Sequence, residues 1–136
     1  MARLSSGDDE ASVEKRLPLS PAEFHIMLAL ATGERHGYAI MREVAEQTGG
    51  QMRLGPGTLY GSIRRMLSDG VIEESEARPD PSADDERRRY YRLTAYGRRV
   101  AEAEAARLRA LTRVAEERGL LPGASGGQPA GAGGVR

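Results

Sequence analysis

The side chains with the most distinctive chemistry in this sequence are arginines, and they gather at two places. Arg64 and Arg65 are neighbours in one segment, and a triplet further along consists of Arg87, Arg88 and Arg89. A guanidinium group presents a rigid fork of donors that suits a guanine edge or a phosphate group. The two groups together indicate contact with nucleic acid.

The first group falls on a predicted amphipathic helix over residues 55–69. Its apolar stripe consists of Leu59, Ile63, Met66 and Leu67, which are spaced for one helical face. The opposite face and its flank carry Gly57, Thr58, Gly61, Arg64, Arg65, Ser68 and Tyr60. A helix that enters a DNA major groove about 12 Å wide needs short side chains at its start and hydrogen-bond donors beyond them. This segment meets both conditions.

The arginine triplet falls on a predicted β-hairpin with a long tip. Two weakly alternating segments flank a polar loop with two prolines, and the second of them is residues 87–93. Alternation along this strand places Tyr91 and Leu93 toward the core and Tyr90 on the other face. Arginines at such a tip can follow the DNA backbone or enter a narrow minor groove. They could instead pair with the acidic residues of the loop at 80–86, and the sequence leaves both interpretations open.

Charge is distributed unevenly along this chain of 136 residues, whose formal net charge is zero. A zero net charge argues weakly against nucleic acid, because domains that bind it are usually basic. The zero is an average over two opposite blocks, since residues 71–86 carry seven acids against one arginine and residues 87–99 carry six arginines and no acid. Two solvated surface segments would give the same pattern, but the basic block coincides with the hairpin.

Residue types that other functions need are missing or scarce. The chain has no cysteine, and its two histidines, His25 and His36, give poor support for a metal site. We find no phosphate-cradling glycine motif and no nucleophile elbow, so we expect no enzyme activity and no cofactor. No apolar run approaches the roughly 20 residues that span a bilayer, and the N-terminus lacks the apolar region of a signal peptide. We therefore expect a soluble cytoplasmic protein with no membrane partner.

The chain is long enough for one modest domain with a tail at each end. Residues 1–18 are expected to be a disordered or partly ordered tail, and residues 119–136 a disordered tail rich in Gly, Ala and Pro. Residues 19–94 are predicted to form three helices and a hairpin, which is a mainly α (α+β) winged helix-turn-helix. Residues 95–118 are predicted to form a long last helix after the capping residue Thr94.

Two helices present more apolar surface than such a domain can bury. The first helix opens with the capping segment Ser20-Pro-Ala-Glu23 and is apolar almost all round. The helix over 95–118 carries a stripe of small and medium residues, and a second copy of the chain is its natural partner. The residues assigned to this dimer contact are Phe24, Met27, Ala101, Ala105, Leu108, Leu111 and Ala115.

Four segments form a set that is specific in its order and spacing. They are Leu17-Pro-Leu-Ser-Pro-Ala-Glu-Phe24, His36-Gly-Tyr-Ala-Ile40, Gly55-Pro-Gly-Thr-Leu-Tyr60 and Arg89-Tyr-Tyr-Arg-Leu-Thr94. This set closely resembles the PadR family of transcriptional regulators, in its short subgroup with a single C-terminal helix. The resemblance covers residues 17–118. Two features depart from the pattern of this family. The hairpin, called the wing, has a long acidic loop at its tip, and Gly61 and Ser62 stand where family members often have proline and alanine.

The resemblance implies a winged-helix homodimer that usually represses transcription, with residues 55–69 as its recognition helix. It implies that Tyr38 begins the second helix beside a DNA phosphate, although a tyrosine there is also often a core residue with a wet hydroxyl. It places Thr58 and Tyr60 at the start of the recognition helix. The full set of expected DNA contacts is Tyr38, Gly57, Thr58, Tyr60, Gly61, Arg64, Arg65, Arg87, Arg88, Arg89 and Tyr90.

We therefore expect a sequence-specific DNA-binding transcriptional regulator, and a homodimeric repressor in particular. Its recognition helices would enter successive major grooves about 34–36 Å apart on a pseudo-palindromic operator in double-stranded DNA. No dedicated ligand domain is visible, so we expect a small apolar effector to bind at the dimer interface. This effector or another signal would shift the dimer between a spacing that fits the operator and one that does not. Two alternatives stay open: a winged-helix module that mediates protein-protein contact, and a small-molecule binder with no DNA role. Activation in place of repression also fits the sequence.

Overall fold

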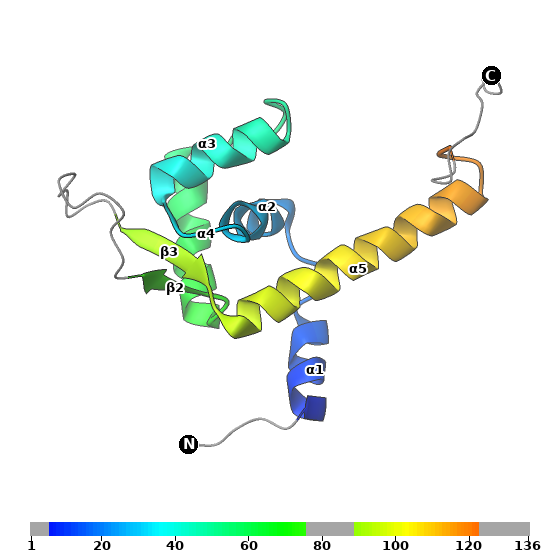
Figure 1. The fold of residues 1–136 in the computed structure, drawn as a ribbon, viewed down its shortest axis with the longest axis horizontal. Coiled ribbons are helices and arrows are strands. Elements are labelled where there is room, and N and C mark those ends of the chain that lie inside the picture. Colours follow the sequence, from blue (N-terminus) through cyan, green and yellow to red (C-terminus); the bar gives the residue numbers. More distant parts are fainter. Residues whose placement is uncertain (1–5, 76–88, 123–136) are drawn as a thin grey trace. The chain divides into compact units, whose positions relative to one another are not determined.

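The computed structural model describes residues 6–75 and 89–122 of the chain. Its elements follow one another as α1 (Ser6–Lys15), α2 (Pro21–Leu30), β1 (Arg35–His36), α3 (Gly37–Gln47), α4 (Pro56–Asp69), β2 (Ile72–Ser75), β3 (Tyr90–Leu93) and α5 (Ala95–Glu117) (Figure 1). They belong to two compact units, residues 1–104 and residues 105–136, with the boundary inside α5. The first unit contains the predicted winged helix-turn-helix.

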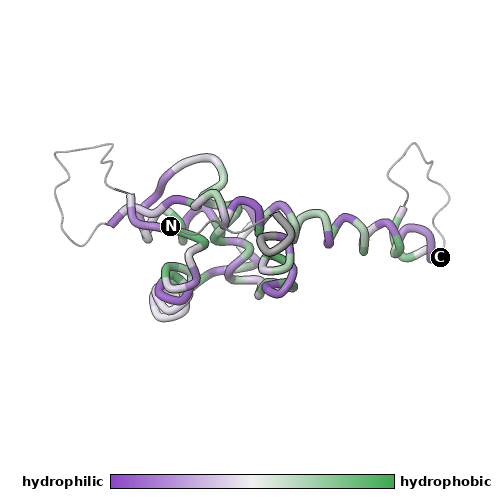
Figure 2. The backbone as a smooth tube through the Cα atoms, turned by 90° about the horizontal axis from the view of Figure 1, so that it is seen from below, coloured by the Kyte–Doolittle hydropathy of each residue, from purple (hydrophilic) through white to green (hydrophobic). Residues whose placement is uncertain are grey.

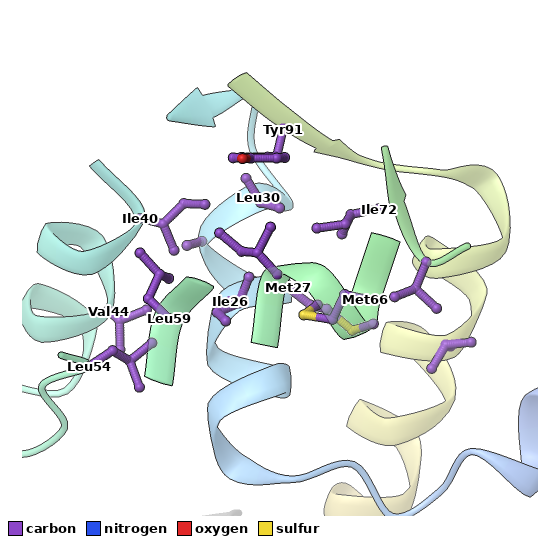
Figure 3. Close-up of a cluster of buried hydrophobic side chains, with 14 of the residues drawn as sticks. Ile26, Met27, Leu30, Ile40, Val44, Leu54, Leu59, Met66, Ile72 and Tyr91 are labelled. Carbon is purple, nitrogen blue, oxygen red and sulfur yellow. The ribbon is translucent and has the colours of Figure 1, made fainter. Parts of the chain in front are cut away.

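The core of the first unit lies where α2, α3 and α4 pack against one another and where α4 meets β2 (Figure 3). The apolar side chains of this core are almost fully buried. They come from α2 (Ile26 and Met27), α3 (Ile40 and Val44), α4 (Leu59 and Met66), β2 (Ile72) and β3 (Tyr91). The apolar stripe that predicts the helix over 55–69 therefore lies largely on the surface along which α4 meets its neighbours. The structure confirms a mainly helical fold with a small sheet and a long last helix.

The sheet has three antiparallel strands in the order β1-β3-β2. In the β2-β3 hairpin, Glu73 lies opposite Arg92, and β1 pairs with the other edge of β3. Tyr91 is buried, as the alternation of β3 predicts. The sequence does not predict β1, because two residues are too few to show an alternating pattern. β3 is therefore fixed along both of its edges.

Short polar side chains fix the ends of the helices. Ser20 caps α2, since its hydroxyl accepts a hydrogen bond of 3.2 Å from the backbone N–H of Glu23. The Thr94 hydroxyl accepts from the Gly97 N–H at 2.9 Å and donates to the Gly70 carbonyl at 2.7 Å. Gly70 ends α4 with a left-handed φ of 79°, which glycine adopts without strain. The two capping residues predicted from the sequence, Ser20 and Thr94, are confirmed.

A helix, α1, is present in the segment that the sequence predicts to be a disordered or partly ordered tail. α1 buries one apolar side chain, Val13. Its other contacts are polar: the Ser12 hydroxyl lies 2.7 Å from the hydroxyl of Tyr96, which also accepts from Arg16 Nε at 3.0 Å. Arg16 Nη1 also lies 3.1 Å from Oδ2 of Asp69 at the end of α4. One buried valine leaves no hydrophobic periodicity, so this packing cannot be detected in the sequence pattern.

Two residues lie elsewhere than the sequence indicates. Leu67 is assigned to the buried stripe of α4, but its side chain is 36% exposed, because it lies about 100° around the helix from Met66. Met27 is assigned to the dimer contact, but it is 1% exposed and packs inside the core. Met27 therefore has almost no surface left for a partner subunit, and its assignment is wrong.

The second unit contains the C-terminal part of α5, where apolar and polar residues alternate along the backbone (Figure 2). Four of its large apolar side chains are exposed to solvent: Leu111, Val114, Leu120 and Leu121. Among the described residues, no helix is both long and apolar enough to cross a membrane.

Candidate nucleic-acid interface

The polar face of α4 is the centre of the candidate site. Gly57, Thr58 and Arg64 are exposed, and Leu59 and Ile63 on the other face are buried. Pro56 occupies the first helical position, where its missing N–H has no helical partner to lose. The sequence pattern thus folds into a helix anchored by one face, and its opposite face is free to meet a ligand.

The two glycines of this face are not required by packing among the described residues. Apart from the adjacent residues and the nearby backbone of α4, a Cβ atom built on Gly57 or Gly61 would meet no described heavy atom within 4 Å. A glycine in a helix costs about 1 kcal/mol of stability relative to alanine. Both glycines therefore leave little side-chain bulk on the outer surface of α4, and neither contributes to the core.

The structure distinguishes the two arginines of α4. The Arg65 Nε atom lies 3.7 Å from Oε2 of Glu23 in the first turn of α2, and its Nη2 donates to the Ser62 hydroxyl at 3.4 Å. Arg64 is exposed, and no ion pair or hydrogen bond of its side chain is found among the described residues. Arg64 is therefore the more available of the two cations for a ligand in front of α4.

The His-Gly-Tyr and Gly-Thr-Leu-Tyr segments meet in the fold. Gly37 is buried under the ring of Tyr60, and a Cβ on Gly37 would lie only 2.8 Å from Cζ of that ring. A side chain at this position would require the Tyr60 ring to move. The contact packs the start of α4 against the start of α3, and Tyr60 remains 38% exposed at the junction.

The start of α3 carries an exposed tyrosine beside a cation. The side chain of Tyr38 is 58% exposed, which excludes the core role that the sequence leaves open for it. The Arg42 guanidinium lies 5.6 Å from the centroid of the Tyr38 ring, within the range of a cation–π contact. Residues four apart on a helix share a face, so the spacing from 38 to 42 could have revealed Arg42, which the sequence analysis misses.

His36 links this tyrosine to the sheet. Its Nδ1 accepts a hydrogen bond of 3.2 Å from the Ala39 N–H and so caps α3. Its ring stacks near Tyr38, with centroids 6.5 Å apart, and meets the ring of Tyr90 edge-on at 5.3 Å. Tyr38 and Tyr90, both predicted contacts, are thus brought to one place by His36, for which the sequence predicts no role in DNA binding.

The arginines of the hairpin are paired with glutamates. Arg89 Nη1 lies 2.8 Å from Glu74 Oε2, and Arg92 Nε lies 2.8 Å from Glu73 Oε2. Hydrogen bonds and charge from these glutamates raise the pKa of both guanidinium groups. Arg87, Arg88 and the acidic residues at 80–86 lie outside the described residues. Arg89 is thus paired with an acid of β2, and the pairing with the acidic loop that the sequence leaves open stays a prediction.

The residues assigned to a dimer contact differ in exposure. Phe24 and Ala101 are half-buried in the first unit. In the second unit, Leu108 and Ala115 are half-buried, and Ala105 and Leu111 are exposed. No group of three or more His, Asp or Glu side chains that could hold a metal ion is present in the described part of the chain.

Residues 26–103, more than half of the chain, match the sequence model of a family described as "Transcriptional regulator PadR-like family". A curated protein of Streptomyces fradiae, the uncharacterized 37.1 kDa protein in transposon TN4556, is 38% identical over 84 residues. That alignment covers 62% of this chain and 22% of the relative, so the chain spans less than a quarter of the relative's length.

Solved structures support the same grouping. A PadR family transcription regulator of Clostridium difficile has a TM-score of 0.63 and 26% identity, covering 73% of this chain and 98% of that one. BpsR of Bordetella bronchiseptica, whose structure concerns the regulation of its DNA binding by 6-hydroxynicotinic acid, has a TM-score of 0.57 and 21% identity, covering 84% and 75%. These two structures share the fold of this chain, and the match to the family model over more than half of its length shows that the chain belongs to the PadR-like family of transcriptional regulators.

Proposed function

We propose that this protein is a sequence-specific DNA-binding repressor that acts as a homodimer on double-stranded DNA. The observation that carries the proposal is the exposed face of α4. Two glycines that packing among the described residues does not require lie there beside Arg64, which has no ion pair in the same part of the chain. Short side chains allow close approach to the floor of a major groove, and an arginine beyond them can donate two hydrogen bonds to a guanine. Family membership supports a regulatory role.

The proposed contacts divide into base readout and backbone grip. Arg64 and Thr58 of α4 contact base edges, or they position the helix in the groove. Tyr38, with Arg42 held against its ring, binds a phosphate at the start of α3. The triplet at 87–89 and Tyr90 approach the backbone or the minor groove next to the half-site. Phosphate contacts fix position and base contacts supply the sequence preference.

The proposed dimer uses the apolar face of the second unit. Leu111 and Val114 are exposed there and lie three residues apart, on one side of a helix. Leu108 and Ala115 extend the same stripe, and Phe24 and Ala101 contribute from the first unit. A symmetric dimer places two recognition helices in successive major grooves about 34–36 Å apart, which requires a pseudo-palindromic operator.

We further propose that a small apolar effector binds at the dimer interface and releases the repressor from DNA in the cytoplasm. The effect reported for BpsR, whose DNA binding is regulated by a small aromatic acid, supports this mode of control. An effector of this kind shifts the dimer between a spacing that fits the operator and one that does not.

The experiment that tests the proposal is a fluorescence-anisotropy titration of the purified protein on DNA from upstream of its own gene. A random duplex serves as competitor, and the titration is repeated across salt concentrations. A repressor binds the upstream duplex more tightly, with two subunits per site and a steep loss of affinity as salt rises. Equal weak binding to both duplexes would favour the alternative of a protein-contact module, once genome-wide selection of DNA fragments had returned no preferred site.

A further inference from the structure

Both arginines that the structure describes in the wing (residues 72–93) are neutralised from within the chain. Arg89 Nη1 donates to Glu74 Oε2 at 2.8 Å, and no second carboxylate among the described residues pairs with it. Arg92 has two acidic partners, since its Nε donates to Glu73 at 2.8 Å and its Nη1 lies 3.5 Å from Glu34 Oε2. The described cations of the wing therefore carry counter-charges before any DNA is bound.

The pair formed by Arg89 and Glu74 lies on the face of the wing that adjoins the recognition helix. Side chains alternate between the faces of a strand, so Arg89 shares its face with Tyr91. Burial raises the pKa of Tyr91, electrostatic interactions with Glu74 and Tyr60 raise it further, and Arg89 lowers it. These groups are therefore neighbours, and Tyr60 belongs to α4. Arg92 lies on the opposite face.

A carboxylate and a phosphate offer the same kind of acceptor to a guanidinium group. Both are anionic pairs of oxygens that accept the parallel N–H bonds of an arginine fork. Arg89 is 63% exposed and Glu74 is 43% exposed, so DNA could reach the arginine while Glu74 occupies part of its donor fork. Arg64 on α4 differs, since no described acid holds it.

We propose that Glu74 is an autoinhibitory counter-ion of Arg89, occupying the place that a DNA phosphate would take. This inference rests on the DNA-binding function proposed above. A phosphate must displace Glu74 before it binds Arg89, and the displaced carboxylate then repels it. Because phosphate contacts carry no sequence information, Glu74 lowers affinity for every duplex by the same factor.

The test compares wild type, Glu74→Gln, Arg89→Gln and the double variant on an operator and on a random duplex. Glutamine keeps the size of glutamate, and both side chains are at the surface, so the variants fold; thermal unfolding verifies this. Glu73→Gln is the matched control. It removes the same charge at the neighbouring position, but Arg92 keeps Glu34 as a partner.

Glu74→Gln should tighten binding to both duplexes by the same factor, because a phosphate then binds Arg89 without displacing a carboxylate and without being repelled by it. The gain should disappear in the Arg89→Gln background and be smaller for Glu73→Gln. A double-variant comparison isolates this coupling.

Three results would overturn the inference: no gain for Glu74→Gln, an equal gain without Arg89, or an equal gain for Glu73→Gln. The last two would mean that net charge alone acts. If the wild type shows no salt-sensitive binding to either duplex, the proposed function fails and the inference fails with it. If the wild type binds its operator but Glu74→Gln changes nothing, only the inference fails.

Discussion

Gly61 is a residue that the fold does not explain. It lies in the interior of α4, where a glycine weakens the helix, and a Cβ there would meet no atom of the other described elements within 4 Å. Gly37 and Gly97 are different, because a Cβ on either would collide with Tyr60 or with the Val71 carbonyl. The chain thus has glycines that serve packing and glycines on the exposed face of α4, and only the second kind calls for an external partner.

Gly61→Ala should raise the free energy of unfolding by up to about 1 kcal/mol, because alanine is the better helix former. The same variant should bind the operator more weakly, because the added methyl group lies on the face that approaches the bases. Denaturant unfolding and fluorescence anisotropy measure the two effects. Gly97→Ala is the contrasting control and should destabilise the fold. Unchanged operator affinity in Gly61→Ala would show that DNA does not approach α4 at this position.

At the scale of elements, the sequence reveals what depends on long apolar patterns or on capping residues. α3 and α4 could be predicted because each packs one apolar face into a shared core, and α2 because the capping segment at Ser20 precedes a helix that is apolar almost all round. α4 could be assigned to recognition from its polar face. α1 and β1 could not, because Val13 alone anchors α1 in the core and β1 is only two residues long. The pairing of Arg89 with Glu74 depends on the register of the hairpin, which the sequence does not specify.

Thr94 connects three elements and is the point at which the wing passes into α5. Thr94→Ala removes the cap of α5 and the hydrogen bond to Gly70, and should lower the free energy of unfolding by about 0.5–2 kcal/mol. Thr112→Ala, at an exposed position of the same helix, is the control and should have little effect or stabilise slightly. Equal changes in the two variants, measured by denaturant unfolding, would show that the cap is not what stabilises this junction.

At the scale of the whole molecule, the proposed dimer follows from the apolar residues that the second unit leaves exposed. The double variant Leu108→Glu and Leu111→Glu should convert the dimer to a monomer, because two charges on each helix would be buried without partners. Light scattering coupled to size exclusion gives the mass directly. Thr112→Glu, one position along the helix, is the control and should remain dimeric. A double variant that still elutes as a dimer would place the interface elsewhere.

The central claim is that α4 reads bases in the major groove, and protection of guanine N7 from dimethyl sulfate tests it most directly. The wild type should protect guanines in two half-sites about one helical turn apart, and Arg64→Ala should lose protection at one symmetric position while Arg65→Ala keeps it. Loss of that contact should cost about 1–3 kcal/mol of binding free energy. Wild-type binding with no protected guanine, or an unchanged pattern in Arg64→Ala, would contradict the assignment of α4 and Arg64 to base readout.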